Sequence, residues 1–524
     1  MLNRLLFPLL FFALLLAGCT PETAGTAPPA PTTPSTPVQS PEATSPKKTD
    51  LVIGMEADAA TMLPVTVQQY ITDVQLRNIY DSLIDRDMDG NFVPVLATEW
   101  KNVDDLTWEF TLKEGIKFHN GEDFNAEAVK FTIDYILKEE NKSFYRSRWT
   151  NVKEAKVIDN YKVHFITTKP FPALLERVAD DLMIMPPKYI AQVGLQEAAK
   201  NPVGTGPYKF KKWTRDQSLE LVANEEYWRG APSIKNLTFR YIPEFSARLS
   251  SFLSGEIHLV KNLPVDSVET VKGNPNAKVE SVGAARINYI VLNNFLDTPL
   301  KEKKVRQALN YAVNVDEILK TVLNGHGIRM TGPLPTISRE YVSIPGYEYN
   351  PEKAIQLLKD AGYSDPSQLT LQLDTPNGRY PMDSHVSQAI ASQLQKIGIN
   401  VSVQVNEFIT HANKVTQREM KGAYLLGTGP VFDSQGVIEV LFTKDSPFSG
   451  FYHPEVEEQI QKLTVTINPE ERQKIFSFLQ QKLIEEAAWI PLWQQEDIYA
   501  VTKNLQFKPR PDERMLAYEM SWEQ

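Results

Sequence analysis

The sequence predicts an α/β fold with more than one lobe, and three observations support this prediction. Residues 369–374 and 399–405 have the apolar patterning of strands, and residues 386–397 between them carry an apolar stripe at helical spacing. A strand, a helix and a second strand in this order form a parallel βαβ unit, because parallel strands need a crossover connection. In the N-terminal half, residues 107–113 and 161–167 alternate between apolar and polar side chains, which is typical of half-buried strands. The length of 524 residues is sufficient for two or more globular units.

The other expected elements follow from the same two periods and from boundary signals. We expect Asp73 to cap a helix that continues through residue 83, and Asn125 to cap a second helix. Asn350 and Pro351 predict the start of a third helix, which Gly362 ends. Further strands are expected at residues 50–56, 237–242, 254–260, 286–293 and 489–501, and further helices at residues 244–253, 301–312, 434–442, 454–464 and 469–487.

Residues 1–18 predict a signal peptide and not a part of the fold. Arg4 gives a short positive start, and the apolar run over residues 5–16 is too short for a permanent membrane span. The run ends in Leu-Ala-Gly-Cys, which resembles a lipid-attachment motif, and Cys19 is the only cysteine of the chain. We therefore expect Cys19 to carry lipid and the body to fold without a disulfide. The alternative is a chance cysteine after an ordinary signal peptide.

Residues 19–48 predict a lipidated tether. After Cys19 the segment consists mainly of Pro, Thr, Ser, Ala and Gln, a composition that cannot bury enough apolar surface to offset the entropy of ordering. The net charge of −10 is spread along the chain without a basic block, which argues against nucleic acid as a partner. We expect a cell-envelope protein that is lipid-anchored to a membrane and faces the periplasm or the exterior.

Residues 201–213 contain the most distinctive turn of the chain. Gly204 and Gly206 lie between prolines, and the alternation that starts at residue 208 predicts a hairpin with residues 218–222. A phosphate-binding loop is excluded, because a third glycine at nucleotide-fingerprint spacing is missing and Pro207 leads into a strand. The pattern favours a buried turn that fixes the hairpin.

Sequence motifs for catalysis or metal binding are missing from the chain. It has no Gly-x-Ser-x-Gly elbow, no His-Glu-x-x-His pair and no nucleophilic cysteine. His119 lies in a turn beside Phe118 with no second His or Cys at metal-ligand spacing, so we interpret it as a structural hydrogen-bonding residue. We expect no enzyme activity, no cofactor and no metal site, although scattered Ser, His and Asp side chains could converge in space.

Two loops offer candidate ligand-binding residues. The loop after the strand at 369–374 places Arg379 and Tyr380 at the carboxyl end of a parallel strand, where ligands of such sheets bind. The guanidinium of Arg379 suits a carboxylate, and the alternative is a solvated arginine. The loop over residues 425–434 exposes glycine backbone next to Asp433, which in the alternative interpretation only caps the helix at 434–442.

Several segments resemble one protein family. Asn-Pro-Val-Gly-Thr-Gly-Pro-Tyr at 201–208, the block at 97–129 with Gly-Ile-Lys-Phe-His-Asn-Gly, Ser-Gly-Glu-Ile at 254–257 and Val-Arg-Gln-Ala-Leu at 305–309 occur in family order. The chain resembles the family 5 extracellular solute-binding proteins, the peptide- and nickel-binding group that serves ABC importers. The resemblance extends from Leu51 to about Arg510.

The resemblance implies a two-lobed, periplasmic-binding-protein-like α/β fold with a ligand cleft between the lobes and an extra subdomain in the N-terminal lobe. Residues 49–292 and 489–524 would form the large lobe and residues 293–488 the second. It implies a substrate-binding lipoprotein that captures oligopeptides and delivers them to an ABC permease and ATPase complex, as a monomer. A binder of nickel chelate or another small solute is the alternative in the same fold, and a surface peptidase is the alternative of another class.

The resemblance also implies roles for the two loops. Arg379 and Tyr380 match family positions that help to hold the ligand, and Asp433 matches an aspartate that pairs with the amino group of a peptide. Gly427, Thr428 and Gly429 complete the expected ligand-binding set, with Thr428 where the family commonly has tryptophan. Ser434 is a second departure from the family, which commonly has proline after the aspartate.

Overall fold

A computed structural model describes residues 48–66, 69–429 and 432–523. The signal peptide, Cys19 and nearly all of the tether expected from the sequence lie outside the described residues. None of the described helices is long and apolar enough to cross a membrane.

The strands and helices have the following bounds. The strands are β1 (Asp50–Met55), β2 (Ile84–Arg86), β3 (Phe92–Pro94), β4 (Ala97–Asp104), β5 (Thr107–Leu112), β6 (Val152–Asp159), β7 (Lys162–Thr167), β8 (Tyr208–Thr214), β9 (Ser218–Ala223), β10 (Asn236–Tyr241), β11 (Leu259–Lys261), β12 (Ala277–Leu292), β13 (Ile328–Arg329), β14 (Thr370–Asn377), β15 (Asn400–Glu407), β16 (Ala423–Gly427), β17 (Trp489–Thr502), β18 (Leu505–Gln506) and β19 (Ser521–Trp522). The helices are α1 (Tyr70–Leu76), α2 (Ala126–Leu137), α3 (Leu174–Asp181), α4 (Pro187–Val193), α5 (Leu195–Ala198), α6 (Phe245–Leu253), α7 (Val268–Lys272), α8 (Lys303–Ala312), α9 (Val315–Thr321), α10 (Pro351–Asp360), α11 (Asp383–Lys396), α12 (Phe408–Thr416), α13 (Ser434–Phe442), α14 (Pro454–Leu463) and α15 (Pro469–Glu485).

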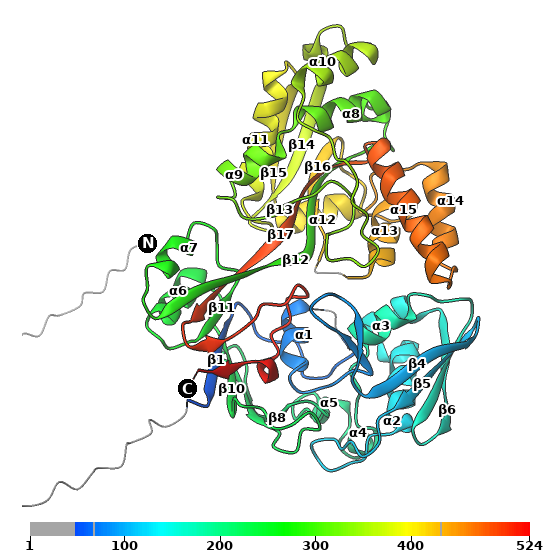
Figure 1. Cartoon of the computed structure of the whole chain (residues 1–524), viewed down its shortest axis with the longest axis vertical. Coiled ribbons are helices and arrows are strands. Elements are labelled where there is room, and N and C mark those ends of the chain that lie inside the picture. Colours follow the sequence, from blue (N-terminus) through cyan, green and yellow to red (C-terminus); the bar gives the residue numbers. More distant parts are fainter. Residues whose placement is uncertain (1–47, 67–68, 430–431, 524) are drawn as a thin grey trace, which may run out of the picture. The chain divides into compact units, whose positions relative to one another are not determined.

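One eleven-stranded sheet runs through the fold, in the order β15-β14-β16-β12-β17-β11-β1-β10-β9-β8, with β13 added to β17. Its centre is the antiparallel pair of long strands β12 and β17, visible as the two extended arrows of Figure 1. Because the outer strands on the two sides of this pair come from different parts of the chain, β12 and β17 connect two separate groups of elements. The α/β fold with two lobes expected from the sequence is confirmed.

The predicted βαβ unit is also confirmed. Strands β14 and β15 pair in parallel, from Thr370↔Asn400 to Asn377↔Glu407, and α11 connects them. Strand β16 pairs in parallel with the other side of β14. The carboxyl ends of β14 and β16 therefore meet at one edge of the sheet, which is where ligands of parallel sheets bind.

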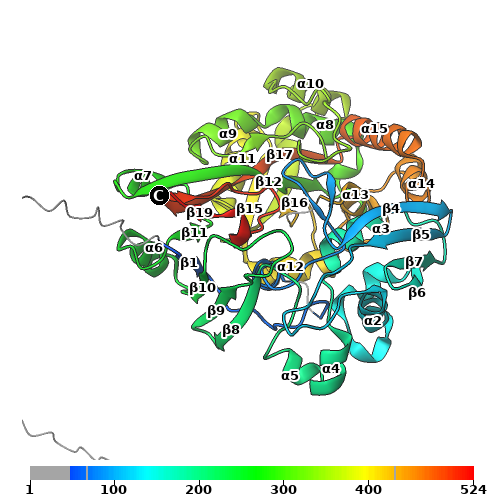
Figure 2. The same cartoon turned by 60° about the horizontal axis from the view of Figure 1, so that its bottom comes forward.

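A second sheet forms a subdomain within the N-terminal half. Its order is β4-β5-β7-β6, and α2 packs on one of its faces (Figure 2). The Asn125 side chain caps α2, as predicted, by accepting hydrogen bonds from the N–H groups of Glu127 and Ala128. Trp149, Phe110 and Phe165 are fully buried in the core that this sheet covers.

The glycine turn at 201–207 packs against the chain that follows α1. A Cβ atom on Gly204 would lie 2.1 Å from the Ile79 carbonyl oxygen, so only glycine fits. The N–H groups of Gly206 and Tyr208 donate to the carbonyls of Ile79 and Asn78. The predicted buried turn and its hairpin, β8 with β9, are confirmed.

The same packing explains one wrong prediction. The helix expected to start at Asp73 and to continue through residue 83 instead spans Tyr70–Leu76, with Asp73 inside it and bound to Arg77 at 2.8 Å. Beyond Leu76 the carbonyls of Asn78 and Ile79 accept hydrogen bonds from the glycine turn and its following strand. The apolar residues that continue the helical pattern therefore belong to a segment that packs against a distant part of the chain. Such long-range pairing overrides local periodicity.

The lobe limits stay a prediction. The separate buried apolar clusters support them: one spans Leu51 to Met520 through β1, β9 and β10, and another spans Ile290 to Trp493 through β14, β16 and α11. The first cluster draws on both chain ends of the described residues, and the second on the middle of the chain.

Candidate functional site

All six residues predicted to bind ligand line one cavity of about 720 Å³, which we call the glycine-loop cavity. Arg379 and Tyr380 reach it from the loop after β14. Gly427 reaches it from the end of β16, and Thr428, Gly429 and Asp433 reach it from the loop that follows β16. Other walls come from α12 and α13 and from residues 147–177 of the N-terminal half, including Arg177 of α3. The cavity therefore lies between the two groups of elements, as expected for a ligand cleft.

The loop after β14 is held by Asp383, which the sequence analysis did not single out. Its buried carboxylate accepts hydrogen bonds from the N–H groups of Gly378, Arg379 and Tyr380 at 3.1, 2.8 and 3.1 Å. An acidic residue in the first turn of a helix commonly binds free backbone N–H groups, so this signal was available in the sequence. Asp383 fixes the direction in which Arg379 and Tyr380 leave the strand.

Tyr380 and Gly427 contact each other across the cavity wall. The Tyr380 hydroxyl donates to the Gly427 carbonyl at 3.2 Å. A Cβ atom on Gly427 would lie 2.7 Å from the Tyr380 ring and 2.8 Å from the Asn288 side chain, so this position needs glycine. Burial raises the pKa of Tyr380, which keeps its hydroxyl protonated and able to donate.

Arg379 presents a guanidinium without an anionic partner in the described part of the chain. Its guanidinium lies over the rings of Tyr380 and Phe408, at 5.4 and 5.3 Å from their centres. Residues 48–66, 69–429 and 432–523 supply no ion pair or side-chain hydrogen bond to it. The residue is exposed as a whole, but partial desolvation of its guanidinium, and then the charge of Arg286, lower the pKa of Arg379. A carboxylate bound to this guanidinium would favour its charged form and so oppose the lowering of its pKa.

Asp433, in contrast, already has a cationic partner. One carboxylate oxygen accepts from the Gly436 N–H at 2.8 Å and caps α13, and the other accepts from the Arg177 guanidinium at 2.6 Å. The residue is 2% exposed. Burial opposes the charge, but Arg177 and the Gly436 N–H outweigh burial and lower the pKa of Asp433. The helix-cap interpretation is confirmed, and an amino group that binds Asp433 would have to share its carboxylate with Arg177.

Arg177 belongs to a charged network around α3. Its neighbour Glu176 binds Arg86 and, at 3.3 Å, Arg339, and Arg339 also binds Glu340 at 3.4 Å. Helix α3 thus contacts the chain near residue 340 as well as the start of α13, and Figures 1 and 2 both show α3 facing α13. The residues involved are far apart in sequence, so the sequence analysis missed the network.

A second cavity of about 810 Å³ shares Arg379 and Tyr380 with the first. We call it the acidic cavity because its ionisable lining is mainly carboxylate. The acids are Glu56, Asp58, Asp266, Glu496, Asp497 and Glu513, and the bases are Arg286 and Arg379. No pattern in the sequence predicted this cavity, because its walls come from the ends of β1, β11 and β14 and from β17.

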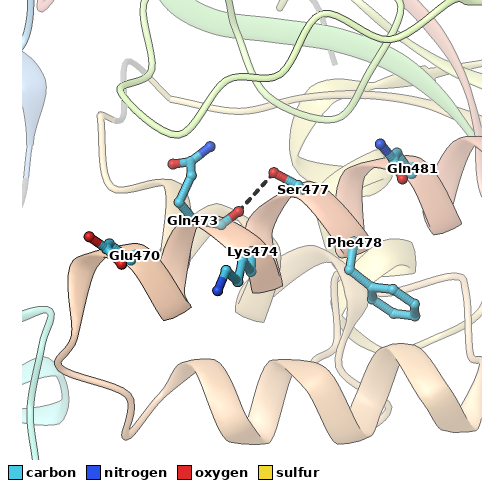
Figure 3. Close-up of a pocket in the computed structure, with 6 residues that line it drawn as sticks. All are labelled: Glu470, Gln473, Lys474, Ser477, Phe478 and Gln481. Atoms are coloured by element: carbon cyan, nitrogen blue, oxygen red, sulfur yellow. Dashed lines mark hydrogen bonds between the residues drawn. The ribbon is translucent and has the colours of Figure 1, made fainter.

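A third hollow, of about 600 Å³, lies on the surface of α15 (Figure 3). All six residues that line it belong to this one helix, and the Ser477 hydroxyl donates to the Gln473 carbonyl within it at 2.8 Å. Ligand sites need polar groups that converge from different elements. This hollow is an exposed helix face and not a candidate site.

His119 has the structural role expected from the sequence. Its Nε2 lies 2.9 Å from the Gly206 carbonyl oxygen, and its Nδ1 accepts from the Gly204 N–H at 3.3 Å. Burial lowers the pKa of His119 to about 4, which favours the neutral ring that these two contacts require. In the part of the chain that the structure describes, no three His, Cys, Asp or Glu side chains gather as a metal site.

Comparisons with known proteins cover most of the chain. The sequence profile of the bacterial extracellular solute-binding proteins, family 5 Middle, matches residues 91–448. The glutathione-binding protein GsiB of Salmonella typhi is 27% identical over 475 residues, which cover 87% of this chain and 91% of that protein.

Solved structures show the same fold. The ABC transporter substrate binding protein CtaP of Listeria monocytogenes matches with a TM-score of 0.83 and 21% identity, over 91% of this chain and 99% of that one. The oligopeptide-binding protein AppA of Bacillus subtilis, solved with a nonapeptide, matches with a TM-score of 0.72 and 24% identity, over 91% and 99% of the two chains.

Proposed function

This chain belongs to the bacterial extracellular solute-binding proteins of family 5, and from that premise we propose that it captures oligopeptides between its lobes for an ABC importer. The observation that carries the proposal is the glycine-loop cavity, which brings Arg379 and Asp433 to one space of about 720 Å³. Cavities of roughly 300–1,000 Å³ are typical of sites for small ligands. The structure of AppA contains a nonapeptide, and GsiB is named as a glutathione-binding protein. Both relatives support a peptide-like ligand for this chain.

Charge matching supports the assignment of the peptide's ends. Arg379 has a guanidinium without an anionic partner among the described residues, and it would bind the ligand carboxylate. Asp433 would bind the ligand amino group. This amino group would either share the Asp433 carboxylate with Arg177 or displace Arg177 from it. Tyr380 and the loop at Gly427, Thr428 and Gly429 would form the wall along which the ligand lies. Closure of the lobes would then remove charged ends from water only where opposite charges are present.

The site of action follows from the N-terminus. We propose that residues 1–18 direct export, that Cys19 carries the lipid, and that residues 19–48 tether the body to a membrane beside the permease and ATPase. The body would act there as a monomer and without catalysis.

Native mass spectrometry of residues 49–524 purified from cells tests the proposal. A ladder of co-purifying masses that fragment as peptides is the expected result. A single nickel-containing mass would instead identify a chelate binder. Peptide added to the protein and recovered as fragments would identify a peptidase.

A further inference from the structure

The acidic cavity contains more carboxylates than its neighbouring cations neutralise. Glu513 is bound by Lys261 and, at 3.1 Å, by Arg286, and all three side chains are buried. Burial opposes the charge of Glu513, but Lys261 and Arg286 outweigh it and lower the pKa of Glu513. Glu513 is therefore the main partner of both cations, although Lys261 also lies 3.9 Å from Asp497, and Arg286 also donates to the Thr428 carbonyl at 3.0 Å.

Two further acids of the cavity are satisfied outside it. The Asp58 carboxylate binds Arg215 at 3.2 Å and the Trp213 indole N–H at 2.8 Å. Glu496 binds His326 at 3.0 Å. Neither carboxylate needs a partner from within the cavity. Asp266 is exposed and accepts a hydrogen bond from the Ser267 hydroxyl at 3.1 Å.

Asp497 and Glu56 are less well satisfied than the other four acids. Asp497 is 2% exposed and lines the cavity. Its Oδ1 accepts a hydrogen bond from the Gln495 amide at 2.8 Å, but its Oδ2 has no hydrogen-bond partner among the described residues. The nearest cation to this oxygen is Lys261 at 3.9 Å, which lies closer to Glu513. Glu56 forms no ion pair within the described ranges, and its one side-chain contact is a hydrogen bond of 3.4 Å from the Asn262 amide. A buried carboxylate oxygen without a hydrogen-bond partner is costly, and Asp497 and Glu56 both line the acidic cavity.

Arg379 lies at the boundary of this cavity and the glycine-loop cavity. A ligand whose carboxylate binds Arg379 therefore has the acidic cavity directly beside that end. The geometry points to a subsite for a cationic group of the ligand: we propose that an ammonium or guanidinium group, held by Asp497 and Glu56, occupies the acidic cavity while a ligand carboxylate binds Arg379.

This inference rests on the proposed function, since the subsite would select peptides with a cationic group for the same peptide-binding site. The cation that we propose is an organic group of the peptide, and in the described part of the chain no three His, Cys, Asp or Glu side chains gather as a metal site. Burial, followed by the charge of Glu513, raises the pKa of Asp497. An organic cation beside Asp497 would reverse that effect.

Calorimetry on the full chain with three tripeptides tests the subsite. The peptides are Ala-Ala-Lys, its norleucine analogue, which has a similar apolar stem but no charge, and N-acetyl-Ala-Ala-Lys. Norleucine measures the contribution of a side-chain cation, and acetylation measures that of the terminal ammonium. Glu56→Gln and Asp497→Asn each remove one carboxylate, and the exposed Glu256→Gln, which lies outside both cavities, is the matched control.

Ala-Ala-Lys is expected to bind about tenfold or more tightly than its norleucine analogue, because its side chain alone brings a cation to the acidic cavity while the terminal ammonium binds Asp433. Glu56→Gln should reduce this preference severalfold while the control leaves it unchanged. Because Glu56 is partly exposed, this variant should fold even if Asp497→Asn does not. Equal binding of Ala-Ala-Lys and its norleucine analogue by the wild-type protein would overturn the subsite and keep the proposed function. Failure of every peptide to bind, with no peptide co-purified from cells, would overturn both.

Discussion

Replacing Asp433 by Asn separates the charge of this residue from its role as a helix cap. Asn caps helices as well as Asp does, so the bond from the Gly436 N–H should persist in Asp433→Asn. What the variant loses is a carboxylate that is 2% exposed and lies 2.6 Å from the Arg177 guanidinium. Two charges with centres about 4 Å apart interact by about 4 kcal/mol at the effective dielectric constant of such sites.

A ligand ammonium that binds Asp433 would lose an interaction of similar size. We expect Asp433→Asn to weaken a free peptide by about 2–5 kcal/mol, roughly 30-fold to several thousand-fold. The N-acetylated form of the same peptide should lose far less, because it brings no charge to this position. Calorimetry with free, N-acetylated, C-amidated and doubly capped peptides measures both effects, and Arg379→Met should show the mirror pattern with the C-amidated form.

Arg177→Met is the matched variant, since it removes the cation that competes for Asp433. If the amino group binds Asp433, free peptide should bind Arg177→Met more tightly than the wild-type protein, and acetylated peptide should not. Two results would refute the assignment. Equal weakening of free and acetylated peptide by Asp433→Asn would leave the residue as a helix cap only. Weaker binding of free peptide by Arg177→Met would mean that the ion pair acts as one unit and that Arg177 itself contacts the ligand.

Three further predictions concern anchoring and stability. Cys19→Ala should release the protein from membranes on fractionation, because several acyl chains are needed for stable anchoring; retention would contradict lipidation. Gly204→Ala should destabilise the fold by about 2 kcal/mol or more in chemical denaturation, because its Cβ would overlap the Ile79 carbonyl, whereas Gly332→Ala, which meets no atom within 4 Å, should not. Burial lowers the pKa of His119 from 6.5 to about 4, so as the pH drops the unfolded chain binds a proton at this residue before the folded chain does. The free energy of unfolding should therefore fall, by at most about 3 kcal/mol, between pH 6.5 and about 4. His119→Gln should remove this part of the pH dependence, and an unchanged slope would contradict the assignment.

Elements with local signals were predictable from the sequence. Asn125 and Asn350 cap their helices as expected, because an N-cap depends only on the next few residues. The parallel unit from β14 to β15 followed from its period and length. Strand β12 begins at Ala277, well before residue 286 where the sequence predicted its start, because its first half pairs with the distant strand β17. That pairing has no local signal.

The candidate site divides in the same way. The positions of Arg379 and Asp433 in loops that follow strands were predictable from the βαβ unit and from the family resemblance. Their partners did not: Arg177 is separated from Asp433 by 256 positions, and Glu513 from Arg286 by 227. Ion pairs of this kind depend on which surfaces the whole fold brings together, and a charged residue in sequence carries no mark of its distant partner.

Arg379 connects these findings, because it is the only cation that lines both cavities and lacks an anionic partner within the described ranges. On one side lies Asp433, whose charge Arg177 already neutralises, and on the other lies Asp497, whose Oδ2 has no hydrogen-bond partner among the described residues. A ligand carboxylate at Arg379 can therefore be followed by a cation in either direction. Toward Asp433 that cation competes with Arg177, which lies 2.6 Å away, and toward Asp497 it competes only with Lys261, which lies 3.9 Å away. If the amino group displaces Arg177, ligand binding and the contact between α3 and α13 exclude each other. If the cation enters the acidic cavity, both persist together. The response of free-peptide binding to Arg177→Met, an increase in the first case and none in the second, distinguishes the two orientations.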